Sequence, residues 1–154
     1  MRNASTSAIV ALVTAASACA APPIAPPLQP AGISASFGKT WNAVVDVLAE
    51  RNIPVKTMDR SSGFVSAELA SISATDFDKL ANCGSTLSQL MTGSATADGV
   101  ARYNILVRGD STTSTVKVTA RFVKGGDTAK ECPSNNVFEG QFQTEVKGRA
   151  EGHQ

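Results

Sequence analysis

Few residues in this chain are of a type that could carry out chemistry. The sequence has 154 residues and one histidine, His153. Histidine is the commonest general base and a frequent metal ligand, so its scarcity argues against Ser–His or Cys–His catalysis and against His-ligated metals. Serines and threonines are numerous, but no recognisable base accompanies them to activate a hydroxyl. We therefore expect no enzyme, no cofactor and no metal site.

Two short motifs match parts of known catalytic or nucleotide-binding signatures. Residues 36–39 read S-F-G-K and fit the S-x-x-K nucleophile motif, but the S-D-N and K-T-G motifs that accompany it are absent from the sequence. Residues 38–40 read G-K-T, like the end of a phosphate-binding loop, but that loop needs glycine where Ile33 stands. The prediction for this region is a helix capped by Ser36, with a lysine on its surface.

Three groups of polar residues could contact ions or partners. Asp46 and Glu50 lie four residues apart, which places them on one face of a helix, and a solvated face is the favoured interpretation. Asp76 and Asp78 fit the start of a short helix. A turn of Asp59, Arg60, Ser61, Ser62 and Gly63 is either an ordinary hairpin turn or a contact loop for a partner, with Arg60 at its tip.

Composition limits the class of protein. Hydrophobic residues make up 42% and charged residues 18%, and this length suits a single domain with a real core. Lysine and arginine number 14 against 13 aspartate and glutamate. Since binding to phosphates needs a basic surplus, no nucleic-acid partner is expected.

The first residues are typical of an export signal. Arg2 precedes an apolar stretch over residues 8–16, which is shorter than the ~20 residues that a membrane-spanning helix needs. The stretch ends in A-S-A-C at residues 16–19, and small residues before a cysteine resemble the bacterial lipobox. The resemblance implies a signal peptide over residues 1–18, a lipid on Cys19 and sorting to the outer membrane. Plain secretion to the periplasm, after cleavage at the A-x-A site, is the alternative.

A proline-rich segment follows the lipobox cysteine. Residues 19–32 hold five of the seven prolines, and such a segment forms neither a helix nor a central strand. In an extended polyproline conformation, at ~3.1 Å per residue, it would hold a domain about 40 Å from its anchor. We therefore predict a tether over 19–32, a single domain over 33–149 and a tail over 150–154.

The three cysteines are an odd number for an exported protein. With Cys19 as lipid carrier, Cys83 and Cys132 remain as a pair, and an oxidising compartment favours a disulfide between them. Two free, buried thiols are the alternative. A metal site is less favoured, because no C-x-x-C and no nearby histidine would complete it.

Hydrophobic spacing indicates the elements of the domain. Phe37, Trp41, Val44 and Leu48 lie on one face of a predicted helix that Asn52 and Pro54 end. Alternation or β-branched residues predict four strands, at 53–58, 64–69, 100–108 and 115–124.

The other segments have weaker patterns. Thr75 can cap a short helix over 76–80. Residues 85–98 are small and polar, which predicts a loop. Residues 136–147 fit a helix with Ser134 or Asn135 as its cap, or alternatively a strand, because phenylalanines there satisfy both spacings. The expected fold class is α+β, with two layers: an antiparallel sheet of about four strands and helices on one face.

Residues 37–69 resemble a known family of domains. The run F-G-K-T-W-N-A-V-V-D-V-L at 37–48, I-P-V at 53–55 and D-R-S-S-G-F-V at 59–65 are similar to the repeated domain of BamC-type (NlpB) lipoproteins. That family supplies accessory subunits of the outer-membrane β-barrel assembly machine. The resemblance implies a helix-grip sheet and a role in outer-membrane assembly.

Together these observations predict a non-enzymatic, lipid-anchored protein on the periplasmic side of the outer membrane. Its domain would bind an envelope protein partner through the exposed sheet, an edge strand or the 59–63 turn. The alternative is a periplasmic binder of a small molecule or lipid, of helix-grip type, which would require an apolar cavity between helix and sheet.

Overall fold

The computed structural model describes residues 25–83, 99–124 and 130–152. Within these ranges the elements follow in the order β1 (Ala31–Ile33), α1 (Phe37–Glu50), β2 (Val55–Asp59), β3 (Phe64–Ile72), α2 (Ala74–Leu80), β4 (Gly99–Gly109), β5 (Ser114–Lys124), β6 (Lys130–Pro133) and α4 (Val137–Ala150). The predicted loop over 85–98 lies outside these residues.

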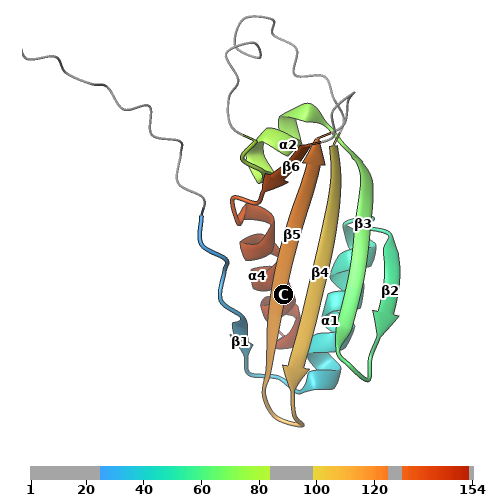
Figure 1. Ribbon diagram of the computed structural model, residues 1–154. Coiled ribbons are helices and arrows are strands. Elements are labelled where there is room, and N and C mark those ends of the chain that lie inside the picture. The colour runs from blue at the N-terminus through green and yellow to red at the C-terminus, as the bar shows by residue number, and fades with distance from the viewer. Residues whose placement is uncertain (1–24, 84–98, 125–129, 153–154) are drawn as a thin grey trace, which may run out of the picture.

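The strands form one antiparallel sheet, and the long helices lie against one of its faces (Figure 1). The strand order is β1-β5-β4-β3-β2, and β6 pairs with the same side of β5 as β1 does, farther along the strand. The α+β class is confirmed, with six strands in the described sheet rather than about four. The additional strands, β1 and β6, have three and four residues. Strands this short give no periodic signal in the sequence.

The core lies between the sheet and the pair α1 and α4. Alternate residues of the central strands point into it, among them Tyr103, Ile105, Val107, Val116, Val118 and Phe122. The helices contribute Trp41, Val44, Val47, Leu48, Phe138, Phe142 and Val146. Because the other residues of β4 and β5 are largely exposed, the sheet has one buried and one open face.

Helix α1 begins and ends at predicted signals. The Oγ of Ser36 accepts a hydrogen bond from the Lys39 N–H at 3.4 Å, which satisfies one of the free donors of the first turn. After the C-cap Arg51, Asn52 adopts a left-handed conformation with φ of 51°, and the chain turns toward β2. Trp41 is buried, as its place on the apolar face predicted.

The last element is a helix and not a strand. Phe138, Phe142 and Val146 all pack into the core, so the spacing of four decides the structure. The Oδ1 of Asn135 accepts from the Val137 N–H at 3.2 Å, and the Oγ of Ser134 accepts from the Asn136 N–H at 3.0 Å.

The helix α4 runs past the predicted end of the domain. It continues beyond Lys147 to Ala150, which is buried, so the domain includes the first residue of the predicted tail.

The proline-rich segment does not act as a free tether from residue 25 onward. It runs beside α4 into β1 (Figure 1), and α4 side chains bind its carbonyls. The amide of Asn136 donates to the Pro26 carbonyl at 2.7 Å, and the Lys147 ammonium donates to the Gly32 carbonyl at 2.7 Å. Residues of the predicted tether thus contact the domain that was predicted to begin at residue 33. Proline-rich chain lacks N–H donors, but its carbonyls remain good acceptors for helix side chains.

The short helix α2 starts before the residue expected to cap it. Ser73, not Thr75, is the N-cap: its Oγ accepts from the Asp76 N–H at 3.2 Å and donates to the Asp76 carboxylate at 2.8 Å. Both residues carry a hydroxyl and both have an Asp three positions later, Asp76 after Ser73 and Asp78 after Thr75, so the capping pattern in the sequence does not distinguish them.

Candidate functional site

The 59–63 turn has a rigid internal structure. One carboxylate oxygen of Asp59 accepts from the backbone N–H of Ser61 at 2.9 Å and from its hydroxyl at 2.6 Å. Bonds from Ser61 and then Ser62 lower the pKa of Asp59 from 3.8 to about 2. The turn is therefore held in one conformation wherever Asp59 is ionised.

Only part of this turn is available to a partner. Asp59, Arg60 and Ser61 are exposed and Ser62 is half-buried, but Gly63 is buried. A Cβ at position 63 would lie 2.1 Å from the Val107 carbonyl oxygen. Gly63 is thus removed from the set of predicted contact residues, since it is required for the close approach of two strands.

Strand β2 is an exposed edge of the sheet. All five of its residues are exposed, and in the part of the chain that the structure describes only β3 pairs with it. Val55 and Met58 are 40% and 43% exposed, and they are opposite the buried Ala67 and Val65. Their side chains therefore lie on the helix-bearing face, beyond the area that α1 covers.

The open face of the sheet is polar, and two of its arginines are paired with carboxylates. Arg102 and Arg121 are directly opposite each other on β4 and β5. The Glu68 carboxylate binds Arg102 at 3.0 Å, and Glu131 binds Arg121 at 3.0 Å. The bonds from Arg102 and Lys56 lower the pKa of Glu68. Exposed pairs of this kind contribute little stability, so this face is chiefly a solvated surface.

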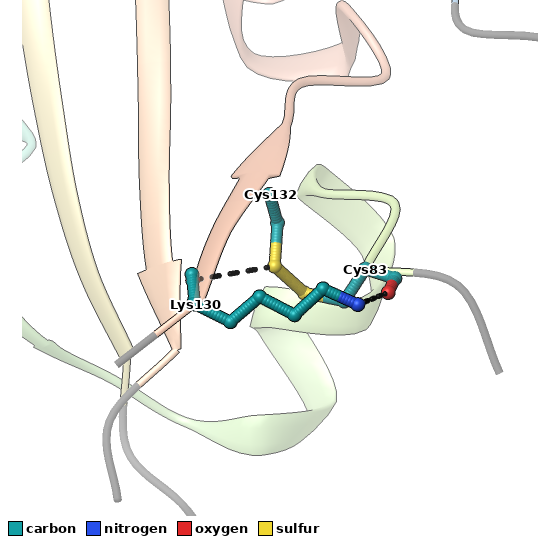
Figure 2. The surroundings of a disulfide bond; sticks show 3 residues. All are labelled: Cys83, Lys130 and Cys132. Atoms are coloured by element: carbon teal, nitrogen blue, oxygen red, sulfur yellow. Dashed lines mark hydrogen bonds between the residues drawn. A yellow bond between two sulfur atoms is a disulfide. The ribbon is translucent and has the colours of Figure 1, made fainter. Parts of the chain in front are cut away.

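A disulfide joins Cys83 and Cys132, with an S–S distance of 1.98 Å and 4.7 Å between the Cα atoms. The predicted pair is confirmed. Figure 2 shows the Lys130 side chain running beside the bridge, where its ammonium donates to the Cys83 carbonyl at 2.7 Å. Cys132 is 1% exposed and Cys83 is half-buried.

Hydrogen bonds on both sides of the disulfide hold the end of α2 to β6 and the start of α4. The Asn82 N–H donates to the Pro133 carbonyl at 2.9 Å, and the Asn135 N–H donates to the Leu80 carbonyl at 3.0 Å. The Asn135 amide also bonds the Lys79 carbonyl. The disulfide thus closes a segment that backbone pairing already aligns.

A cavity of about 350 Å³ opens on the helix-bearing face between β3, α2 and the start of α4. Its walls are apolar and come from five parts of the chain: Ile53, Leu69, Ile72, Leu80, Tyr103 and Phe138. The polar residues that line it, and that are more exposed than its apolar walls, form its mouth: Arg51, Ser71, Ser73 and Asp76. A concave apolar site with few polar groups is the usual form of a small-molecule site.

Arg51 is held at the mouth by both aromatic and ionic contacts. Its guanidinium lies 5.6 Å from the ring centre of Phe138 and 5.9 Å from that of Phe142. Its Nε and Nη2 donate to one oxygen of Glu145 at 2.9 and 2.6 Å. Its Nη1 takes part in neither bond.

An aromatic stack forms the deep wall of the cavity. The ring of Tyr103 stacks on that of Phe138, with 4.1 Å between ring centres. Burial, followed by the Glu139 carboxylate, raises the pKa of Tyr103 to about 12. The phenol is therefore a neutral hydroxyl at any ordinary pH.

The remaining predicted residues have structural roles or lie outside the described ranges. Glu50 binds Arg149 at 2.5 and 2.7 Å, and Asp46 lies 4.0 Å from the same guanidinium. The Arg149 guanidinium of α4, rather than a metal ion, thus contacts both carboxylates, and Glu50 raises the pKa of Arg149. Cys19, the signal segment and His153 are outside the described ranges.

Within residues 25–83, 99–124 and 130–152, no group of three or more His, Cys, Asp and Glu side chains is arranged to hold a metal ion. None of the helices in these ranges is long and apolar enough to cross a membrane.

Comparison with known proteins gives no family. No family model matches the chain, and no curated protein matches it. Among solved structures it is similar to a DUF4468 family protein from Bacteroides ovatus, at 12% identity, over 80% of this chain and 75% of that one, with a TM-score of 0.39. A likeness this distant assigns neither fold nor function to the chain.

Proposed function

We propose that this protein is a non-enzymatic, lipid-anchored protein on the periplasmic side of the outer membrane, and that its α+β domain binds an envelope protein partner. The observation that carries the binding role is β2, an edge strand whose five residues are all exposed. Val55 and Met58 extend apolar surface beside its unpaired edge. An edge of this kind is a common docking site for an extended segment of a partner.

The Cys83–Cys132 disulfide supports the export part of this proposal. Disulfides of this buried, structural kind persist in oxidising compartments and are rare in the cytosol of most organisms. The anchor itself is tested by the intact mass of protein extracted from membranes. A diacylglyceryl modification at Cys19, and loss of the protein from the membrane fraction in Cys19→Ala, are expected. An unmodified mass from membranes would overturn the anchor.

The binding surface is tested by photocross-linking from single positions in cells. A photoreactive residue at Met58 or Arg60 is expected to give one discrete adduct. The matched control is Gln141, which is exposed on α4, far from β2 along the chain. Equal adducts from Met58 and Gln141, or none from any position, would contradict the role of the β2 edge.

The BamC-type resemblance makes the partner more specific. Helix α1, the β2–β3 hairpin with its Asp59–Gly63 turn and the open sheet support a helix-grip relation of this kind. On this basis the Met58 adduct should contain a subunit of the β-barrel assembly machine. An adduct with an unrelated envelope protein would retain the binding role and reject the pathway.

The cavity between β3, α2 and α4 favours a second function, the binding of a small molecule or lipid. Its volume of about 350 Å³ is within the ~300–1,000 Å³ of ordinary ligand sites. This function does not depend on the β2 edge, because its cavity lies at the other end of β3.

A further inference from the structure

We propose that this cavity binds a small amphiphilic carboxylate, with its apolar body against Tyr103 and Phe138 and its carboxylate on Arg51. The proposal rests on the second function above and names the chemistry of its ligand. A short acyl chain or a flat aromatic acid has this chemistry.

The walls select an apolar body of limited size. Ile53, Ile72, Tyr103 and Phe138 are almost fully buried, yet all border the cavity. A volume of about 350 Å³ corresponds to roughly a dozen water molecules at ~30 Å³ each. Because release of water from an apolar wall is favourable, the cavity favours a ligand with an apolar body that takes the place of this water.

Arg51 supplies a fixed positive group at the mouth. Its side chain is 28% exposed, and the rings of Phe138 and Phe142 lie under its guanidinium. Glu145 occupies Nε and Nη2, so the planar group is oriented before a ligand arrives, and Nη1 remains as a donor. A pre-oriented guanidinium loses little entropy when it binds a carboxylate.

Asp76, the other charged residue that lines the cavity, offers no donor to an anion. It accepts from Ser73 at 2.8 Å and from Lys79 at 3.1 Å, and these bonds lower its pKa, so its carboxylate stays charged. Arg51 is the cationic residue of the lining, and Glu145 occupies its Nε and Nη2, so the ligand carboxylate is placed on Nη1.

The other cavities have a different chemistry. One of about 320 Å³ lies between α1 and the end of α4, and charged residues such as Asp46 and Arg149 line it. One of about 240 Å³ lies beside β5, with Pro27 and Leu28 on one wall. Among the cavities found in the described residues, only the cavity between β3, α2 and α4 combines aromatic walls with a guanidinium nitrogen, the Arg51 Nη1, that makes no bond to Glu145.

The experiment measures binding of a fluorescent probe and its displacement. 8-Anilinonaphthalene-1-sulfonate, an aromatic anion, is titrated into the folded chain and then displaced by octanoate or octanol. We expect one probe site per chain. Octanoate should displace the probe at about a tenfold lower concentration than octanol, because a hydrogen bond to a charged group is worth ~1.5–3 kcal/mol.

Two variants locate the site. Arg51→Gln should weaken octanoate about tenfold and leave octanol unchanged. Ser71→Trp should block the mouth and abolish probe binding, whereas Ser66→Trp, on the open face of the same strand, should not. Circular dichroism checks that each variant folds, and Ser71→Trp keeps the Arg51 contacts intact.

The outcomes separate the two proposals. Equal displacement by octanoate and octanol, or an Arg51→Gln variant with unchanged selectivity, would overturn the carboxylate and leave the binding function standing. Absence of a saturable probe site, or a site that Ser71→Trp does not affect, would overturn both.

Discussion

Gly63 shows how one residue can decide whether two strands meet. Its φ is +65°, its N–H bonds the Arg60 carbonyl at 3.2 Å, and its carbonyl accepts from the Val107 N–H at 2.8 Å. A side chain at this position meets both a disfavoured backbone conformation and the Val107 carbonyl.

Gly63→Ala should therefore lower the free energy of unfolding by about 2 kcal/mol or more. Gly32→Ala is the control, because a Cβ there would have no atom within 4 Å. Its effect should be within about 0.5 kcal/mol. Urea unfolding measures both. Similar losses in the two variants would show that the Val107 contact does not matter.

Asp59 gives the turn a dependence on pH. Its pKa is lowered to about 2 in the folded chain, so its contribution to stability is full above about pH 4. That contribution is lost as the pH falls from about 4 to about 2, because the unfolded chain then binds the proton more readily. Asp110 in the β4–β5 turn has a pKa of about 2 for a similar reason, through bonds from Thr113 and Thr112.

Asp59→Asn should flatten the fall in stability over this pH window, because an amide does not titrate there. Urea unfolding at several pH values between 2 and 5 measures the slope. Asp59→Asn combined with Asp110→Asn should flatten it further. A double variant with the slope of the unchanged chain would contradict the assignment.

At the scale of elements, side chains of α4 bond backbone groups of β5 that no strand pairs with. Beside β5 there is a gap between β1, which ends its pairing at Val116, and β6, which begins its pairing at Arg121. Glu139 accepts from the Ala120 N–H at 3.1 Å, and Gln143 donates to the Val116 carbonyl at 3.3 Å. This explains why two polar residues of α4 are buried.

Glu139→Ala should lower the free energy of unfolding by about 2 kcal/mol, because it leaves the buried Ala120 N–H without an acceptor. Glu139→Gln should recover part of the loss, since its amide oxygen can accept the same bond. Gln141→Ala, on the exposed face of α4, should have an effect within about 0.5 kcal/mol. Thermal unfolding measures all three, and a neutral Glu139→Ala would refute the role.

The elements with clear periodicity were predictable from the sequence. The Phe37–Leu48 face, the alternation of β5 and the turn at Asp59 all placed their elements correctly. The strands β1 and β6 could not be predicted from the sequence, because the strand that it pairs with determines whether a three- or four-residue segment is a strand. The binding of residues 25–30 to α4 was missed for the same reason, since proline-rich composition indicates extension but not where the extended chain lies.

The candidate sites divide in the same way. The cysteine pair followed from counting, and it is joined as expected. The cavity did not follow, because Arg51, Leu69 and Phe138 come from separate elements, and no spacing along the chain brings them together. From the sequence we could state only the requirement that a ligand site would need an apolar cavity between helix and sheet.

For the whole molecule, the disulfide closes a loop of 49 residues that contains β4, β5 and the start of β6. In the chain-entropy model a loop of this length contributes up to about 4 kcal/mol by restricting the unfolded chain. Cys83→Ala with Cys132→Ala should therefore lower the melting temperature by about 10 °C. Dithiothreitol should produce the same loss in the unchanged chain and none in the double variant. A double variant that melts within about 2 °C of the unchanged chain would contradict this.

The binding of the proline-rich segment to α4 sets how far the domain can travel. If Cys19 carries the lipid, only six peptide units separate it from residue 25, where the chain joins the folded body. Six units span at most about 20 Å in any conformation, half the reach of the full proline-rich segment. The domain would then be confined to a thin layer against the bilayer, and its partner or ligand would have to come to that layer.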